Sequence, residues 1–466
     1  MLTAETNEDV RTSFWPRVRE FAVPTSVIET ATARRLAGDW AGACVAAGFD
    51  VDLNLRSVAR VHGRELAGRV RSDLRALAPD LLRWHMPRIA PDGLLRPGLT
   101  LSLARYAAFG HALHLVVRTA PAWADAGQRI TLALWPPAGS DPCRHPHPRP
   151  GPRFRLDLHR HLWDAGRADE LRVRAGVGLS AVTDPVLLNA VPPGLGCAVG
   201  RWADEARIVL GAEGRSAGAV LVRLGGRHRL VLEVPEGAGG PVRIAEARPP
   251  YAALPVLPDA ATWVPPDLEL LDSGAIEADQ LHPLVAAALA PDHVRRRSAS
   301  GPPSGPRYVE CRGAVHRIGL VDGVLVPLDH DPEEIRREEL LVALTGTPLP
   351  CLQAVDRAHR RPHSLDDVRE RLAHGDIDGA LAVVEELLGP DALLRAGPLR
   401  DALEAAARQR VVYGLFKAGL AGDGPARKRW DEYAVSHGCW CCGDRRRRDV
   451  RARLERRSHP RHANLR

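Results

Sequence analysis

The hydrophobic pattern of residues 64–84 has the spacing of an amphipathic helix. Apolar side chains recur every three or four positions, which places them on one stripe: Leu66, Val70, Leu74, Leu77, Leu81 and Trp84. The opposite face carries arginines, whose charge is most simply solvated there: Arg64, Arg69, Arg71, Arg75 and Arg83. Pro79 is expected to interrupt this helix one turn from its end.

Short apolar or alternating runs predict strands elsewhere. Three of them follow the helix, at residues 99–103, 113–118 and 130–135. Residues 219–224 and 229–234 predict a hairpin around Gly225-Gly226, because glycine accepts the positive φ of tight turns, and residues 207–210 are expected to add a third strand. Asp322-Gly323 predicts a further hairpin between residues 316–320 and 324–328.

Helical patterns follow at residues 267–270 and 278–290 and dominate from about Pro332 to Tyr433. The motif Gly-Asp-x-x-Gly-Ala occurs twice, within residues 36–43 and 372–380. Glycine can end one helix in the left-handed conformation and aspartate can cap the next. Both copies resemble the helix-pair junction of tetratricopeptide-like repeats, which implies a helical hairpin at each site. The two copies are too far apart in the sequence to form a stacked array.

Two segments are predicted to be linkers, one rich in proline and histidine and one rich in serine, glycine and proline. With them the chain divides into six parts: an N-terminal α+β domain (1–136), a linker (137–152), a β-rich middle domain (153–296), a linker (297–307), a C-terminal hairpin with a helical domain (308–438) and a Cys/Arg-rich tail (439–466). The expected fold is a multi-domain α+β protein, with helical hairpins at both ends and antiparallel β-hairpins in the middle.

The amino-acid composition limits what the basic residues indicate about function. Of the 64 basic residues only Lys417 and Lys428 are lysine. GC-rich coding, which favours Arg, Ala, Gly and Pro codons, explains this ratio better than any folding requirement. Arginine runs are therefore weak evidence for nucleic-acid binding in this chain, and the net charge of +7 is small for its length.

The sequence predicts a cytoplasmic protein without a membrane partner. No run of 18 or more apolar residues is present, and the acidic start of the chain lacks the features of a signal peptide. The eight cysteines are mostly scattered, which is not the pattern of a disulfide scaffold. Free thiols are expected.

The C-terminal tail carries the candidate metal and nucleic-acid residues. Cys439 and Cys442 have the spacing of a zinc knuckle, and His459 with His462, or His437, would complete a zinc site. The gap between the pairs departs from that of established zinc fingers, so free or redox-active thiols are the alternative. The tail also contains an arginine run suited to phosphate contacts, or equally to a solvated tail: Arg445, Arg446, Arg447 and Arg448.

The segment Asp329-His330-Asp331-Pro332 resembles a metal-ligand cluster but is better interpreted as a helix start. Asp331 is the expected N-cap, Pro332 occupies the first helical position and two glutamates follow in the first turn. His330 alone has no role in that interpretation. A looser group surrounds the first linker, where nothing fixes its geometry: His145, His147, His159 and His161.

Familiar catalytic and nucleotide-binding motifs are absent from the sequence, including a Walker-type loop, a Gly-x-Ser-x-Gly elbow and His-Glu-x-x-His. Pieces of residues 311–351 resemble uncharacterised proteins of high-GC actinobacteria, among them Cys311-Arg312-Gly313, Asp322-Gly323 and Asp329-His330-Asp331. The resemblance covers about a tenth of the chain and implies a bacterial cytoplasmic origin without an activity.

Three functions are compatible with these features. The leading hypothesis is a non-catalytic intracellular subunit or adaptor that binds other proteins in a bacterial assembly, with no cofactor beyond zinc in the tail. The second is a nucleic-acid-binding protein that uses the tail. The third is an enzyme, favoured if His330 and nearby carboxylates met other polar groups in a deep pocket.

Overall fold

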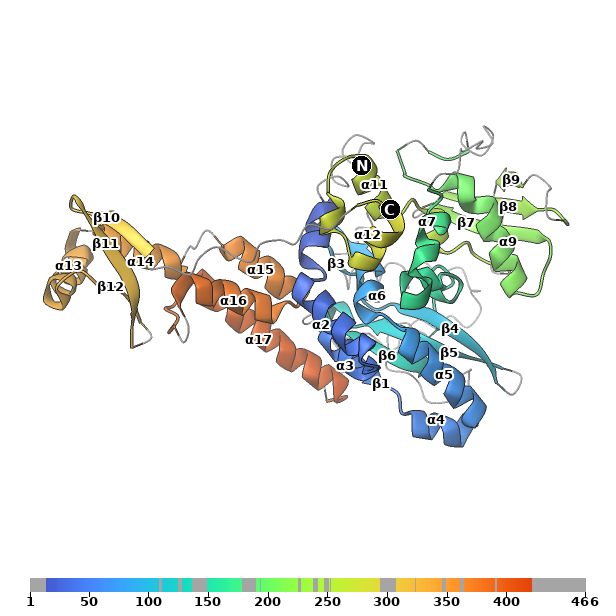
Figure 1. Ribbon diagram of the computed structural model, residues 1–466, viewed down its shortest axis with the longest axis horizontal. Helices are drawn as coiled ribbons and strands as arrows, with labels where there is room; N and C mark the ends of the chain where they lie inside the picture. The colour runs from blue at the N-terminus through green and yellow to red at the C-terminus, as the bar shows by residue number, and fades with distance from the viewer. Residues whose placement is uncertain are drawn as a thin grey trace, which may run out of the picture. The chain divides into compact units, whose positions relative to one another are not determined.

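The computed structural model describes residues 14–108, 111–124, 128–135, 149–177, 190–192, 194–224, 228–237, 242–246, 251, 253–293, 307–322, 324–345, 349–360, 364–389 and 392–420. They form two compact units, which meet in the sequence between Arg296 and Arg297. Unit 1 contains described residues 14–293 and unit 2 contains residues 307–420 (Figure 1). Both combine helices with antiparallel strands, which confirms the α+β prediction. None of the described helices is long and apolar enough to cross a lipid bilayer.

The main sheet of unit 1 has the strand order β1-β6-β5-β4. Its strands are β1 (Phe49–Asp52), β4 (Thr100–Ala108), β5 (His111–Thr119) and β6 (Ile130–Trp135). The last three overlap the predicted strands and pair antiparallel, whereas β1 was not predicted and runs parallel to β6. Their inward side chains, such as Leu101, Leu115 and Leu132, are fully buried in the largest core of the protein.

Helices from the first 85 residues contribute to that same core. Residues 14–21 are helical, and the helices that follow are α2 (Thr25–Leu36), α3 (Trp40–Ala46), α4 (Leu55–His62), α5 (Arg64–Ala76) and α6 (Pro79–His85). The interruption predicted at Pro79 is confirmed. The helical pattern of residues 64–84 forms two helices, because the backbone is extended at Leu77 and Ala78 before Pro79 begins α6.

The prediction that the arginines of residues 64–84 form a solvated face is wrong for Arg83. Its side chain is buried and donates hydrogen bonds to the carbonyl oxygens of Ala22 and Gln128, at 3.1 and 2.8 Å. The break at Pro79 changes the helical phase, so α6 turns this arginine inward, where carbonyl oxygens compensate for its burial.

The second sheet of unit 1 contains β7 (Gly218–Leu224), β8 (His228–Val234) and β9 (Arg243–Glu246) in antiparallel order. The predicted hairpin is therefore present. The strand predicted at residues 207–210 is wrong, because these residues belong to α9 (Trp202–Ala212). Trp202, Ala206 and Val209 lie at helical spacing and are buried in a second core against this sheet.

Short elements complete unit 1. They are the strands β2 (Arg88–Ile89) and β3 (Leu94–Leu95), the 3-10 helices η1 (Ala122–Ala124), η3 (Leu156–Leu158), η4 (Arg160–Leu162), η5 (Ala165–Glu170), η6 (Val199–Arg201) and η7 (Ala278–Gln280), and the helices α7 (Leu171–Arg174), α10 (Asp259–Thr262), α11 (Pro266–Asp272) and α12 (Pro283–Leu289). Side chains from α11 and α12 join the first core, as do Phe154 and Trp163. The first core therefore combines residues from both sides of segment 137–152.

Unit 2 begins with an antiparallel sheet of β10 (Arg307–Cys311), β11 (Ala314–Val321) and β12 (Val324–Pro327). The helices described after it are α13 (Pro332–Thr345), α14 (Pro350–Arg360), α15 (Leu365–His374), α16 (Ile377–Leu388) and α17 (Pro398–Lys417). Ile318 and Leu325 of the sheet share a core with α14–α17. The predicted start of α13 is confirmed, because the Asp331 carboxylate accepts a hydrogen bond of 2.9 Å from the Glu333 amide.

Both copies of the Gly-Asp-x-x-Gly-Ala motif have the predicted capping geometry. Gly38 and Gly375 have positive φ values of 78° and 86°. Asp39 accepts a 2.8 Å hydrogen bond from the amide of Gly42, and Asp376 accepts one of 3.0 Å from the amide of Gly379. The second glycine is required because a Cβ atom at position 379 would lie 2.1 Å from the Asp376 carboxylate.

We expect Gly379→Ala to lower the free energy of unfolding of unit 2 by about 1–2 kcal/mol, since the new methyl group displaces the N-cap of α16. The matched control is Gly414→Ala in α17, where a Cβ atom meets no other atom within 4 Å. That substitution should instead stabilise the unit by about 0.5–1 kcal/mol, because alanine is the better residue inside a helix. Urea unfolding followed by circular dichroism measures both. Effects of the same sign would contradict the prediction.

Candidate functional site

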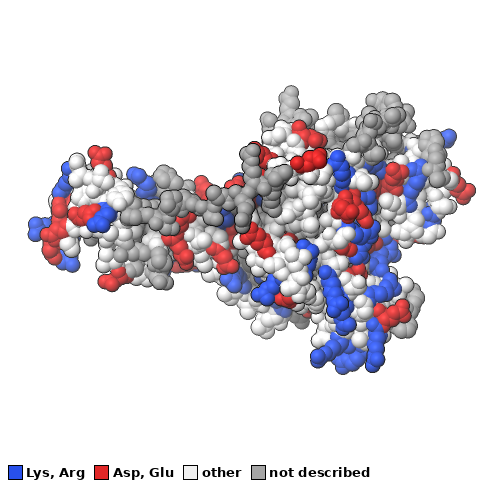
Figure 2. Space-filling view, in the orientation of Figure 1, with Lys and Arg blue, Asp and Glu red and all other residues white. Residues whose placement is uncertain are grey.

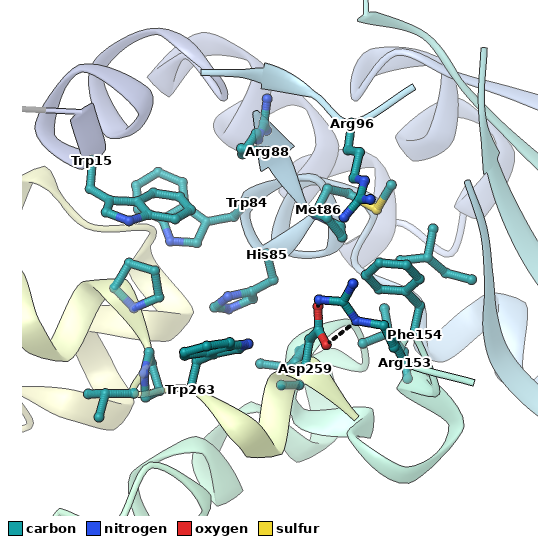
Figure 3. Close-up of a pocket in the computed structure, with 18 of the residues that line it drawn as sticks. Trp15, Trp84, His85, Met86, Arg88, Arg96, Arg153, Phe154, Asp259 and Trp263 are labelled. Atoms are coloured by element: carbon teal, nitrogen blue, oxygen red, sulfur yellow. Dashed lines mark hydrogen bonds and ion pairs between the residues drawn. The ribbon is translucent and has the colours of Figure 1, made fainter. Parts of the chain in front are cut away.

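A cavity of about 140 Å³ lies in unit 1 between four parts of the chain. Its walls come from helical residues 14–21, from residues 84–101, which run from the end of α6 into β4, from residues 153–162 and from residues 259–266. Figure 3 shows Trp15, Trp84 and Trp263 around one side and Phe154 on the other. The cavity is thus built mostly of aromatic and apolar side chains, with a few polar groups between them.

A buried ion pair fixes the aromatic wall. Arg19 donates two hydrogen bonds to the carboxylate of Asp267 in α11, at 2.6 and 3.0 Å, and the side chains are 3% and 1% exposed. The same carboxylate accepts a 3.1 Å hydrogen bond from the indole nitrogen of Trp84. The Arg19 guanidinium also lies over the rings of Trp15 and Trp84, 5.2 and 4.4 Å from their centroids. Such pre-formed walls favour ligand binding, because few groups have to be ordered.

His85 points into this cavity (Figure 3). Burial lowers the pKa of His85 well below its ordinary value, and the positive charge of Arg19 and the neighbouring His282 lower it further. The imidazole is therefore neutral at physiological pH. Its Nε2 atom is buried and has no hydrogen-bond partner within the described residues. A neutral ring nitrogen in that position can exchange a hydrogen bond with a bound molecule.

Arginines also line the cavity, and Figure 3 shows Arg96 and Arg153 near Phe154. Arg153 pairs with Asp259 through hydrogen bonds of 2.8 and 2.7 Å, and Arg88 donates to the carbonyl oxygens of Arg83 and Gly93. Arg96, by contrast, forms no ion pair or side-chain hydrogen bond among the residues that the structure describes. Burial lowers the pKa of Arg96, and the positive charge of Arg153 lowers it further, against the opposing effect of Asp259. A negatively charged ligand would relieve this excess of positive charge.

A separate basic surface lies on α4 and α5 of unit 1, where Figure 2 shows blue side chains close together. Its exposed residues are Arg56, Arg60, Arg64, Arg69, Arg71 and Arg75. On α5, Asp73 is paired with Arg160 at 2.8 Å, which leaves Glu65 as the exposed acidic side chain of that helix. The surface is complementary to polyanions, but charge alone identifies no particular partner.

Unit 2 contains a cluster of metal-ligand side chains. Cys311, His330 and Cys351 each place one donor atom within 4.8 Å of the other two. Both cysteines are fully buried, and they are free thiols, as is Cys44 of unit 1. Burial first, and then a hydrogen bond with Cys311, raise the pKa of Cys351 to about 12. His330, which had no role in the helix start, belongs to this cluster.

The residues proposed from the sequence as the metal and nucleic-acid sites lie outside the described residues. They are Cys439, Cys442, His459 and His462, and Arg445 to Arg448. Of the loose histidine group, His159 and His161 are described and buried, and His159 lies 3.2 Å from the Glu205 carboxylate. Sequence reasoning missed the aromatic cavity altogether. Its residues come from positions 14 to 266, and each of its tryptophans fits an ordinary core position when considered alone.

Comparison with known proteins adds no family. No protein-family model matches the chain, and neither the curated proteins nor the solved structures contain a match to it.

Proposed function

We infer that unit 1 binds a small anionic molecule with a flat apolar body in the cavity between residues 14–21, 84–101, 153–162 and 259–266. The observation that carries this inference is the unpaired guanidinium of Arg96 at the edge of a cavity walled by three tryptophans. Aromatic faces favour a flat apolar group, and an arginine fork favours a carboxylate, which it can hold through two parallel hydrogen bonds.

The size of the cavity restricts the ligand to about one ring. Cavities of roughly 150 Å³ lined by apolar side chains hold a benzene molecule, and this one measures about 140 Å³. The proposed ligand class is therefore an aromatic or similarly flat carboxylic acid. The neutral His85 ring would meet such a ligand between the aromatic wall and the arginines, where its Nε2 atom can take part in a hydrogen bond.

Binding of benzoate tests this proposal, with the neutral amide benzamide as the matched compound. Because Trp15, Trp84 and Trp263 line the cavity, we expect benzoate to change the tryptophan fluorescence of the full chain in a saturable way. Benzamide should bind at least about tenfold more weakly, since a hydrogen bond to a charged group contributes about 1.5–3 kcal/mol. Arg96→Gln should weaken benzoate binding by a similar factor.

The control variant is Arg71→Gln, which removes an exposed arginine from α5 and should leave benzoate affinity unchanged. Equal affinities for benzoate and benzamide would reject the anionic ligand. An Arg96→Gln protein that binds benzoate as tightly as the unsubstituted chain would remove Arg96 from the site.

The interaction-subunit and nucleic-acid-binding hypotheses made from the sequence stay predictions. An interaction subunit should co-purify with partner proteins from its host. A nucleic-acid-binding tail should give salt-sensitive retention on nucleic acid, and that retention should be lost when the chain is truncated after Gly438. Neither hypothesis conflicts with a ligand cavity in unit 1.

A further inference from the structure

Cysteine and histidine side chains from three separate segments of unit 2 lie close together. Cys311 ends β10, His330 lies between β12 and α13, and Cys351 lies in the first turn of α14. We propose that Cys311, His330 and Cys351, with His316 as the fourth ligand, form a structural zinc site. Two thiolates and two imidazoles are a donor set that zinc prefers, and this site is independent of the one predicted in the tail.

The distances suit a zinc ion after a small contraction. Zinc lies about 2.3 Å from sulfur and about 2.0 Å from a histidine nitrogen in a tetrahedral site, so ligand atoms on one ion are roughly 3.5–4 Å apart. The three donor atoms here all lie within 4.8 Å of one another. Each side chain therefore needs to move by only a fraction of an ångström.

The surroundings of His330 orient it as a ligand. Its Nδ1 atom lies 3.6 Å from the carboxylate of Glu334, and that carboxylate is in turn held by Arg312. Its Nε2 atom is buried, has no hydrogen-bond partner within the described residues, and belongs to a side chain that is only 4% exposed. Metal-binding histidines typically present one nitrogen to the ion and the other to a carboxylate or carbonyl. Without a bound metal ion, a buried nitrogen that has no hydrogen-bond partner lowers the stability of the folded state.

His316 supplies the fourth ligand. Its ring stacks on that of His330, with centroids 4.1 Å apart and planes inclined by 14°. Its Nδ1 atom is also buried and has no partner among the described residues. It lies outside the set of three atoms within 4.8 Å, so coordination requires this ring to turn toward the thiols. No other histidine or carboxylate joins that set within the described residues.

The local backbone and core also fit a metal-stabilised structure. Directly after Cys311 the chain turns through Arg312 and Gly313, which have positive φ values of 55° and 79°. A two-residue hairpin turn of type I′ requires positive φ at both positions, and because Cys311 pairs with Ala314 across this turn, Cys311 is fixed at the end of the hairpin. Among the described residues, the core around the cysteines contains the buried side chains of Leu349 and Leu352, with Val309 and Ile335 packed against it. A core of this size supplies little hydrophobic stabilisation, and a bound metal ion can supply the stabilisation that the core lacks.

Elemental analysis of the full chain purified from cells grown with zinc tests the site. We expect Cys311→Ala with Cys351→Ala to lower the zinc content by one ion per chain. The matched control is Cys44→Ala, which removes a buried free thiol from α3 of unit 1 and should leave the zinc content unchanged. Zinc bound by the tail stays in both variants, so the difference between them reports on this site alone. An unchanged zinc content in the double variant would overturn the proposal.

Cobalt binding to the unsubstituted chain gives a second measurement, which does not depend on the double variant folding. Cobalt added after removal of zinc should show thiolate charge-transfer absorption, and mass spectrometry after alkylation should find Cys311 and Cys351 protected by the metal. If these two cysteines are instead found joined as a disulfide, or are alkylated equally with and without metal, the zinc site is rejected. His316→Ala should weaken zinc binding by about tenfold or more, and an affinity within twofold of the unsubstituted protein would exclude His316 as the ligand.

Discussion

Replacing Asp267 with alanine is expected to lower the free energy of unfolding of unit 1 by about 3–5 kcal/mol. The carboxylate is 1% exposed and accepts hydrogen bonds from Arg19 and Trp84. Without it, the guanidinium of Arg19 stays buried without its counter-charge, and a buried charge that loses its partner costs this much. The loss is a large part of the stability of a typical domain.

Urea unfolding followed by tryptophan fluorescence measures this effect. Residues 297–422 contain no tryptophan, whereas eight of the ten tryptophans lie between residues 15 and 263, so the signal reports mainly on unit 1. Asp272→Ala is the matched control, because Asp272 is an exposed carboxylate of the same helix and its removal should change stability by less than about 0.5 kcal/mol. Replacing Arg19 with Met together with Asp267→Leu should recover part of the loss. Equal effects of Asp267→Ala and Asp272→Ala would disprove the buried-pair explanation.

Acid is expected to destabilise unit 1 through Glu205. Burial by itself would raise the pKa of this carboxyl group, but the adjacent His159 ring and the hydrogen bonds from Arg174 outweigh burial and lower it to about 2. Arg174 donates two hydrogen bonds of 2.7 Å. Because the folded-state pKa lies below the ordinary value of 4.5, the stabilisation is complete above about pH 4.5 and is lost as the pH falls toward 2. Its size is about 3 kcal/mol.

The variant Glu205→Gln should therefore be about 3 kcal/mol less stable than the unsubstituted chain at pH 7, with the difference shrinking toward zero between pH 4.5 and 2. The neighbouring Asp204→Asn is the control, because the Asp204 side chain is 80% exposed, and it should follow the unsubstituted protein at every pH. Unfolding free energies measured by fluorescence across this pH range test whether Glu205 causes the loss of stability in acid. Parallel pH profiles for Glu205→Gln and the unsubstituted chain would show that Glu205 is not the group responsible.

The sequence predicted the elements whose signals are local. The strand pairs 219–224 with 229–234 and 316–320 with 324–328 follow from alternation and glycine-containing turns, and the caps at Asp39 and Asp376 follow from residues within four positions. The wrong strand at 207–210 shows the limit of this reasoning. Four apolar or arginine residues fit a strand equally well, and only the stripe that begins at Trp202 identifies the helix.

The candidate sites could not be predicted in the same way, because their geometry depends on contacts between distant segments. Arg96 acquires its significance from Arg153 and Asp259, which no local pattern connects with it. The helix start leaves His330 without a role, but Cys311 and Cys351 lie too far away in the sequence for ligand spacing to link them to it. For both sites the chemical groups are visible in the sequence, but tertiary packing determines which of them lie close together.

The pairing of Arg19 with Asp267 has a consequence for synthesis on the ribosome. The two residues are 248 positions apart, and translation proceeds at about 5–20 residues per second. Asp267, the counter-charge of Arg19, is therefore synthesised roughly 12–50 s after the segment that carries Arg19. During that time the aromatic side chains around it lack their final partner. A chaperone that binds nascent chains would accordingly find its target in residues 14–21, and a pause in translation before Asp267 should increase the amount of aggregated chain.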